Sequence, residues 1–282
     1  MKNNKPQKEF KKKAKKPNDW LPDGTDDKKH TLKENDEWFG LEKRLGQPRI
    51  LKNIFFPKVY DWIHKKYKDN LDNFSYFEAG CGHGNDLRAI KKKMDNQGRY
   101  LGVDISKAEI LHGIEFYRKK ENTEESKKLF AQGDLRNLKD IYIWDKKRND
   151  FSRPSKLKNN EFDLIYMEAV LHGLGHSQKT LKEKRESAQL MLNELYRICK
   201  VGGKFFGRAN IFNNSINNKQ QLEFLRKTNN WRFIPDFKEL MKILKKAGFK
   251  NIKTNLSPHK KAKKYPDKKY LLKFSFLAEK AA

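Results

Sequence analysis

The sequence has few of the features that mark secreted or membrane proteins. Its 282 residues include only two cysteines, Cys81 and Cys199, which form neither a disulfide framework nor a Cys-x-x-Cys metal motif. No run of eighteen apolar residues is present, so a transmembrane helix is excluded on length. The charged N-terminus MKNNKPQKEFKKKAKK is not followed by an apolar segment and does not resemble a secretory signal. We therefore expect an intracellular protein, cytoplasmic or nuclear, without a membrane span.

Acidic residues are also scarce relative to basic ones. The chain has 36 Asp and Glu against 64 Lys and Arg, which gives a formal net charge of +28. Such a charge favours binding to RNA or DNA through release of counterions. However, lysine far outnumbers arginine and asparagine is abundant, as an A/T-rich genome would produce, whereas nucleic-acid sites favour arginine. Charge alone leaves RNA binding and genome composition as open alternatives.

The chain divides into a basic N-terminal arm and one larger domain. The first sixteen residues carry eight lysines and one acid, Glu9, and the turn-rich stretch PNDWLPDGTDD follows. This composition buries too little apolar surface to order itself, so residues 1–45 are predicted to be a flexible arm. Residues 46–282 are predicted to form the domain, beginning with a helix over 50–68 whose apolar residues recur at helical spacing.

From residue 75 onward, apolar strands alternate with amphipathic helices. Five strands are expected at SYFEAGC, RYLGVDI, KLFAQGD, FDLIYMEAV and GKFFGRAN, and two more around 250–256 and 270–279. Helices are expected over 106–120, 182–200 and 235–249, and residues 144–160 as a charged surface excursion. This alternation predicts an α/β fold with a doubly wound, mostly parallel sheet covered on both faces.

Strand ends carry the residues expected to bind a ligand. The first strand runs into the glycine-rich turn Gly80-Cys81-Gly82-His83-Gly84, where main-chain N–H groups can approach a ligand at the carboxyl edge of the sheet. A dinucleotide fingerprint would need glycine or alanine at position 85, which is asparagine. Asp104 ends the second strand, where a carboxylate can accept both hydroxyls of a ribose, and Asp134 ends the third, where it can accept an adenine amino proton.

These features together resemble class I S-adenosylmethionine-dependent methyltransferases over about residues 70–280. EAGCGHG resembles their first motif, GDL at 133–135 their adenine-contacting turn, and LNELYRICKVGGKF their helix–Gly-Gly–strand motif. The resemblance implies seven strands in the order 3-2-1-4-5-7-6, with the seventh antiparallel. It also implies S-adenosylmethionine as cofactor, with contacts from Glu78, Gly80, Cys81, Gly82, Gly84, Asp104, Ile105, Asp134 and Leu135.

The residues after the fourth strand are candidates for substrate contact and catalysis. The cofactor's sulfonium methyl is already electrophilic, so the protein mainly has to align a nucleophile and exclude water. Glu168 and His172 are the candidate catalytic residues, and His172 could take a proton from a hydroxyl or amine. A purely structural role for His172 stays open. His172 and His176 lack an evident third ligand, so no metal site is expected.

The acceptor is not fixed by these motifs. GCGHGNDL, AVLHGLGHS, FFGRAN and RILKNIFFPKVYDWIHKKY resemble messenger-RNA cap guanine methyltransferases, although His83 stands where that family usually has lysine and Gly173 where it has an aromatic residue. Similar strand endings occur in enzymes that modify the transfer-RNA wobble base and in quinone and lipid methyltransferases. The alternatives are therefore RNA bound through basic termini, a small molecule or lipid, a protein, or a non-catalytic RNA-binding protein with this fold.

Overall fold

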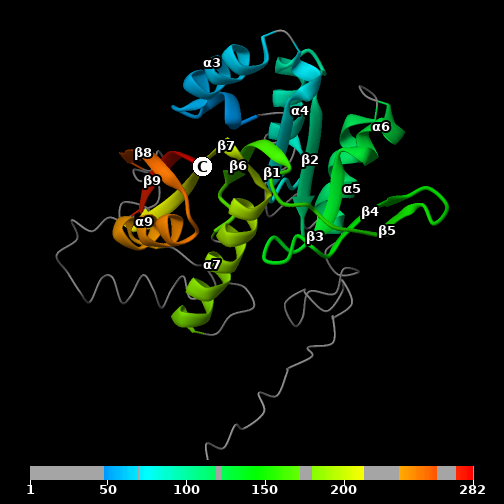
Figure 1. Cartoon of the computed structure of the whole chain (residues 1–282). Coiled ribbons are helices and arrows are strands. Elements are labelled where there is room, and N and C mark those ends of the chain that lie inside the picture. The colour runs from blue at the N-terminus through cyan, green and yellow to red at the C-terminus, as the bar shows by residue number, and fades with distance from the viewer. Residues whose placement is uncertain are drawn as a thin grey trace, which may run out of the picture.

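The computed structural model describes residues 48–68, 70–118, 122–171, 180–212, 235–258 and 271–281 (Figure 1). Within these ranges one continuous sheet of nine strands runs through the molecule in the order β5-β4-β3-β2-β1-β6-β7-β9-β8. The predicted arm, residues 1–45, lies outside the described ranges, so its flexibility and the boundary at residue 46 stay predictions.

The central part of the sheet confirms the expected topology. Strands β3, β2, β1, β6 and β7 are mutually parallel, and β9 lies antiparallel between β7 and β8. This is the predicted order of seven strands, with the last one antiparallel. The bounds of these strands are β1 Ser75–Ala79, β2 Arg99–Asp104, β3 Phe130–Gly133, β6 Phe162–Glu168, β7 Cys199–Phe212, β8 Lys250–Pro258 and β9 Leu271–Glu279.

The prediction of seven strands was wrong by two, because residues 141–155 extend the sheet. Strand β4, Ile141–Asp145, pairs antiparallel with β3, and β5, Asp150–Ser155, pairs antiparallel with β4. The charged stretch DKKRND, interpreted above as part of a surface excursion, contains the hairpin turn at residues 146–149, in which Asn149 has φ 50°. Pro154 lies in β5 at the sheet edge, a position where proline is tolerated.

Helices cover both faces of the sheet, as predicted. One layer contains α3 and α4, at the top of Figure 1, together with α5, while α7 and α9 pack on the other face. The predicted helix over 50–68 is interrupted: a short 3-10 helix at Ile50–Lys52 precedes α3, which begins only at Phe56, with Pro57 in its first turn. The helix bounds are α3 Phe56–Tyr67, α4 Asn85–Lys93, α5 Lys107–Tyr117, α6 Thr123–Lys128, α7 Leu181–Ile198 and α9 Phe237–Lys246.

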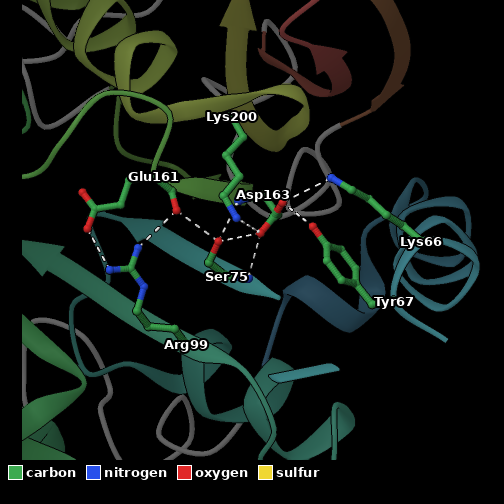
Figure 2. A network of polar contacts seen from close by, with 7 residues as sticks. All are labelled: Lys66, Tyr67, Ser75, Arg99, Glu161, Asp163 and Lys200. Atoms are coloured by element: carbon green, nitrogen blue, oxygen red, sulfur yellow. Dashed lines mark hydrogen bonds and ion pairs between the residues drawn. The ribbon is translucent and has the colours of Figure 1, made fainter. Parts of the chain in front are cut away.

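A polar network joins the amino ends of β1 and β6 (Figure 2). Its centre is Asp163, which is 1% exposed and accepts hydrogen bonds from the Ser75 backbone N–H at 3.1 Å and hydroxyl at 2.6 Å. Lys66 and Lys200 also donate to it, at 3.2 and 2.7 Å, as does the Tyr67 hydroxyl. These donors overcome burial and hold the pKa of Asp163 below its usual range.

Candidate active site

The opposite, carboxyl edge of the sheet contains the topological switch point. Strand β1 is paired with β2 on one side and with β6 on the other, and the chain leaves β1 toward β2 and β3 before returning to β6 and β7. Ligands of open α/β sheets bind at such a point. The turns after β1 and β6 touch here: a Cβ on Gly80 would lie 2.5 Å from a methyl of Val170.

The glycine-rich turn adopts the backbone conformation that its sequence predicts. Gly80, Gly82 and Gly84 have φ of 66°, 49° and 73°, in the left-handed region that side chains disfavour. The turn is held against β2, because the Gly80 N–H donates to the Val103 carbonyl at 2.8 Å. A Cβ on Gly84 would lie 2.5 Å from the Phe130 ring, whereas one on Gly82 would have nothing within 4 Å. The turn is therefore packed at Gly84 and open at Gly82, where a ligand can approach.

Asp104 lies directly beside this turn. Its carboxylate accepts from the Gly82 N–H at 2.8 Å and from the Ser106 N–H at 2.9 Å. Burial raises the pKa of Asp104, and these two hydrogen bonds oppose the rise. The next residue, Ile105, leaves 40% of its surface exposed at the same edge. Such an apolar surface beside a carboxylate suits a nucleoside, whose ring is apolar and whose ribose donates hydrogen bonds.

Glu78 is the most unusual group of the site. It is the penultimate residue of β1, is 4% exposed, and its Oε2 has no hydrogen-bond partner among the described residues. Burial raises the pKa of Glu78 well above its usual range, Asp86 raises it further, and a hydrogen bond from the Leu87 backbone lowers it. A buried carboxyl oxygen without a partner costs free energy in folding, so its place at the switch point indicates a ligand that donates to it.

Asp134 and Leu135 follow β3 at the same edge, as expected. Both oxygens of the Asp134 carboxylate accept hydrogen bonds from the Arg136 guanidinium. Nη2 lies 2.6 Å from Oδ2, and Nε lies 2.9 Å from each of Oδ1 and Oδ2. Leu135 is buried, with 6% exposure. Arg136 was not predicted, and its place two residues after Asp134 was the available signal.

Glu168 ends β6 at the switch point, and arginines surround its carboxylate. Arg208 on the neighbouring β7 contacts both oxygens, with Nη2 at 2.8 Å from Oε1 and Nε at 2.9 Å from Oε2, and the Tyr166 hydroxyl donates at 3.0 Å. The half-exposed Arg49 guanidinium lies 3.7 Å from Oε1. The two arginines were not predicted; a charged residue within the apolar strand FFGRAN was the available signal for Arg208, and Arg49 lies in no motif.

Asp86 fixes the chain that precedes α3 over this edge. Its Oδ1 accepts from the backbone N–H groups of Arg49 and Ile50, the latter at 2.7 Å. Burial raises the pKa of Asp86 to about 6, against these hydrogen bonds. The buried carboxylate thereby places Arg49 next to Glu168. His172 and His176 lie outside the described residues, so the prediction of a catalytic His172 stays untested, as does the role of Glu168.

Two further expectations concern metals and membranes. The described residues contain no cluster of three histidine, cysteine or acidic side chains that could hold a metal ion. None of the helices in the described ranges is long and apolar enough to cross a membrane.

Comparison with known proteins agrees with this geometry. Residues 77–205 match the model of a methyltransferase domain family. A search of curated proteins finds no match. Neither the family model nor the similar structures named below is a messenger-RNA cap guanine methyltransferase, so that narrower resemblance gains no support.

Solved structures share the fold at low sequence identity. Phosphoethanolamine N-methyltransferase 2 from Haemonchus contortus, in complex with phosphomonomethylethanolamine and S-adenosylhomocysteine, superposes with a TM-score of 0.52 at 14% identity over 83% of this chain. The chain covers only 59% of the length of that protein. Geranyl diphosphate C-methyltransferase from Streptomyces coelicolor A3(2), with Mg²⁺, geranyl diphosphate and S-adenosylhomocysteine, gives 0.50 at 11% identity, over 80% of this chain and 81% of its own. The chain therefore matches a methyltransferase domain family over residues 77–205 and shares the fold of these S-adenosylhomocysteine-bound methyltransferases.

Proposed function

We propose that this chain binds S-adenosylmethionine at the carboxyl edge of β1 and β2 and transfers its methyl group to an acceptor held near the end of β6. The observation that carries the proposal is Glu78, a buried carboxyl at the switch point whose Oε2 has no partner among the described residues. S-adenosylmethionine carries an ammonium group that can donate to such a carboxyl. The ligands named for the similar structures, S-adenosylhomocysteine among them, support the same cofactor.

The residues that would hold the cofactor each offer the matching chemistry. The open side of Gly82 allows the ligand to approach the main chain, Asp104 can accept from ribose hydroxyls, and Ile105 offers apolar surface to the adenine. Asp134 and the Leu135 N–H remain proposed adenine contacts. The cofactor, when bound, supplies an electrophilic methyl group, so the protein has to align the acceptor and exclude water. Glu168 and His172 remain the proposed residues for contact with the acceptor.

The proposed acceptor is a small molecule that bears an anionic group. Arg49 supports this proposal, because it is half exposed at the edge where Glu168 ends β6, and Glu168 is already paired with Arg208. A guanidinium in this place suits a phosphate or carboxylate. The two similar structures are named for phosphomonomethylethanolamine and geranyl diphosphate, which both carry phosphate.

RNA is the second candidate acceptor, and the net charge of +28 favours it. The lysine-rich segments 1–45 and 241–282 could attract a phosphodiester backbone to the carboxyl edge. The two candidate acceptors predict different effects of salt and of truncation. RNA binding should weaken steeply as salt rises, and more gradually in a chain without residues 1–45. Methylation of a small molecule should survive that truncation.

Calorimetric titration with S-adenosylmethionine and S-adenosylhomocysteine is the first test of the cofactor. Saturable binding at micromolar ligand supports the proposal, and absence of binding to the folded chain contradicts it. The acceptor is then sought with methyl-labelled S-adenosylmethionine, by incubating the protein with a small-molecule cell extract and, separately, with total RNA. Label in a ribonuclease-sensitive, high-molecular-weight fraction would replace the small-molecule proposal with the RNA one.

A further inference from the structure

Arg88 is a buried arginine directly beneath the glycine-rich turn. It lies in the first turn of α4 and is 7% exposed. Its Nη1 donates to the His83 carbonyl at 2.7 Å and reaches the Gly84 carbonyl at 3.4 Å, while Nη2 donates to the Ser126 hydroxyl of α6 at 2.8 Å. One guanidinium therefore links the turn that follows β1 to a helix nearly forty positions later in the chain.

Two aromatic rings hold the guanidinium in this orientation. Its central carbon lies 4.2 Å from the ring centroid of Tyr117 on α5 and 5.1 Å from that of Phe130 on β3. Stacking on aromatic faces is favourable for arginine and fixes the direction in which its donors point. The Tyr117 hydroxyl donates to Asn85 at 2.9 Å, so the ring is itself tied to the start of α4.

Two glycines allow close packing around Arg88. A Cβ on Gly84 would lie 2.8 Å from Nη1 of Arg88, and a Cβ on Gly113 of α5 would lie 2.3 Å from the His83 carbonyl oxygen. The two glycines thus allow both α5 and the Arg88 guanidinium to approach the His83 carbonyl closely. The charge of Arg88 also acts on the site, because it lowers the pKa of Glu78 against the effect of burial.

We propose that Arg88 is a positioning residue of the cofactor site: it fixes the His83 and Gly84 carbonyls so that the turn keeps the shape in which Gly82 and Glu78 can meet the ligand. This inference rests on the proposed function for the identity of the ligand, but the shape of the turn is a property of the free protein. A lysine cannot replace the arginine fully, since one ammonium cannot span His83 and Ser126 while stacking between two rings.

Affinity for S-adenosylhomocysteine, measured by calorimetry, tests the proposal. Arg88→Met keeps an unbranched apolar stem but removes the charge and the donors, and it should raise Kd on the order of tenfold or more. Arg88→Lys should recover part of this loss. Ser126→Ala, which leaves the arginine in place but removes one of its partners, should raise Kd less than Arg88→Met.

A merely structural role predicts a different pattern. Tyr67→Phe removes a hydrogen bond to Asp163 at the opposite edge, so it should lower the melting temperature and leave Kd unchanged. If Arg88→Met behaves like this control, with lower stability and the parent's Kd, the proposal is overturned. Should Arg88→Met not fold, Ser126→Ala decides the matter, and a Kd equal to the parent's overturns the proposal.

Hydrogen exchange separates this inference from the proposed function, because it needs no ligand. In Arg88→Met, the amides of residues 80–84 should exchange faster than in the parent, while those at the start of β1 and β6 keep their protection. Unchanged exchange in the turn would contradict the positioning role even if S-adenosylhomocysteine binds. If the parent protein fails to bind S-adenosylhomocysteine, the proposed function fails, and the exchange experiment still tests whether Arg88 holds the turn.

Discussion

Carboxyl groups removed from solvent lie near both ends of the paired strands β1 and β6, and their environments at the two ends are opposite. At the amino end, Asp163 has five donors around it, and its pKa is lowered (Figure 2). At the carboxyl end, burial raises the pKa of Glu78, Asp86 and Asp104, and one oxygen of Glu78 has no partner among the described residues. The first arrangement stabilises the fold. The second destabilises the free protein but leaves a carboxyl oxygen available to bind a ligand.

The largest effect is expected at the amino end. Asp163→Ala leaves two lysines, a tyrosine and a serine facing an empty, buried position, so we expect a loss of about 3–5 kcal/mol in the free energy of unfolding. Chemical denaturation measures it. Below its melting temperature, the variant should still bind S-adenosylhomocysteine like the parent. A variant with parental stability would show that the network contributes little and would remove the contrast between the two ends.

Asp104→Ala should have the complementary effect at the carboxyl end. It removes the proposed acceptor for the ribose hydroxyls together with the observed acceptor for the Gly82 N–H. Charge-assisted hydrogen bonds of this kind predict a loss of roughly a hundredfold in affinity for S-adenosylmethionine. Calorimetry measures the affinity and a thermal melt the stability, which should stay close to that of the parent. Undiminished binding would show that the cofactor site is assigned to the wrong residue.

The raised pKa of Asp86 predicts a pH-dependent effect of intermediate size. Burial holds the folded-state pKa of Asp86 at about 6, above its usual value of 3.8, so the protonated form stabilises the fold. This contribution is fully present below pH 3.8 and is lost as the pH rises through about 6. Asp86→Asn keeps an oxygen acceptor for Arg49 and Ile50 without the charge. The free energy of unfolding of the variant should therefore rise by about 1–2 kcal/mol relative to that of the parent as the pH increases from 4 to 8. Parallel stability curves for the two proteins would contradict this.

The smallest effect is expected at the rim of the amino end. Arg99 is half exposed, contacts Glu161 at 2.7 Å and stacks on Phe162 with 4.6 Å between its central carbon and the ring centroid. Ion pairs open to solvent contribute little, so Arg99→Gln should cost less than about 1 kcal/mol. Chemical denaturation of this variant and of Asp163→Ala compares their losses in the free energy of unfolding. The comparison shows whether burial, rather than the number of contacts, determines how much an ion pair stabilises the fold. Equal losses would contradict that view.

The strand order followed from the family resemblance, whereas the strands themselves and the glycine-rich turn could be placed from local patterns. Apolar strands followed by glycines and acids placed Glu78, the glycine-rich turn and Asp104 at one edge, where the structure has them. The hairpin of β4 and β5 was missed because its turn is highly charged and its strands are only partly buried. Long-range partners were missed for a different reason: Arg49 and Asp86, or Arg208 and Glu168, meet through packing that no local period encodes.

The position of β9 has a consequence for how the chain folds during synthesis. This strand, the last in the described sequence, lies between β7 and β8, and β8 pairs with no other described strand. The ribosome therefore exposes residues 250–258 before their neighbour exists, and the sheet closes only when residues 271–279 emerge from the exit tunnel. Until then β7 presents an unpaired edge, the kind of edge to which chaperones and other nascent chains attach.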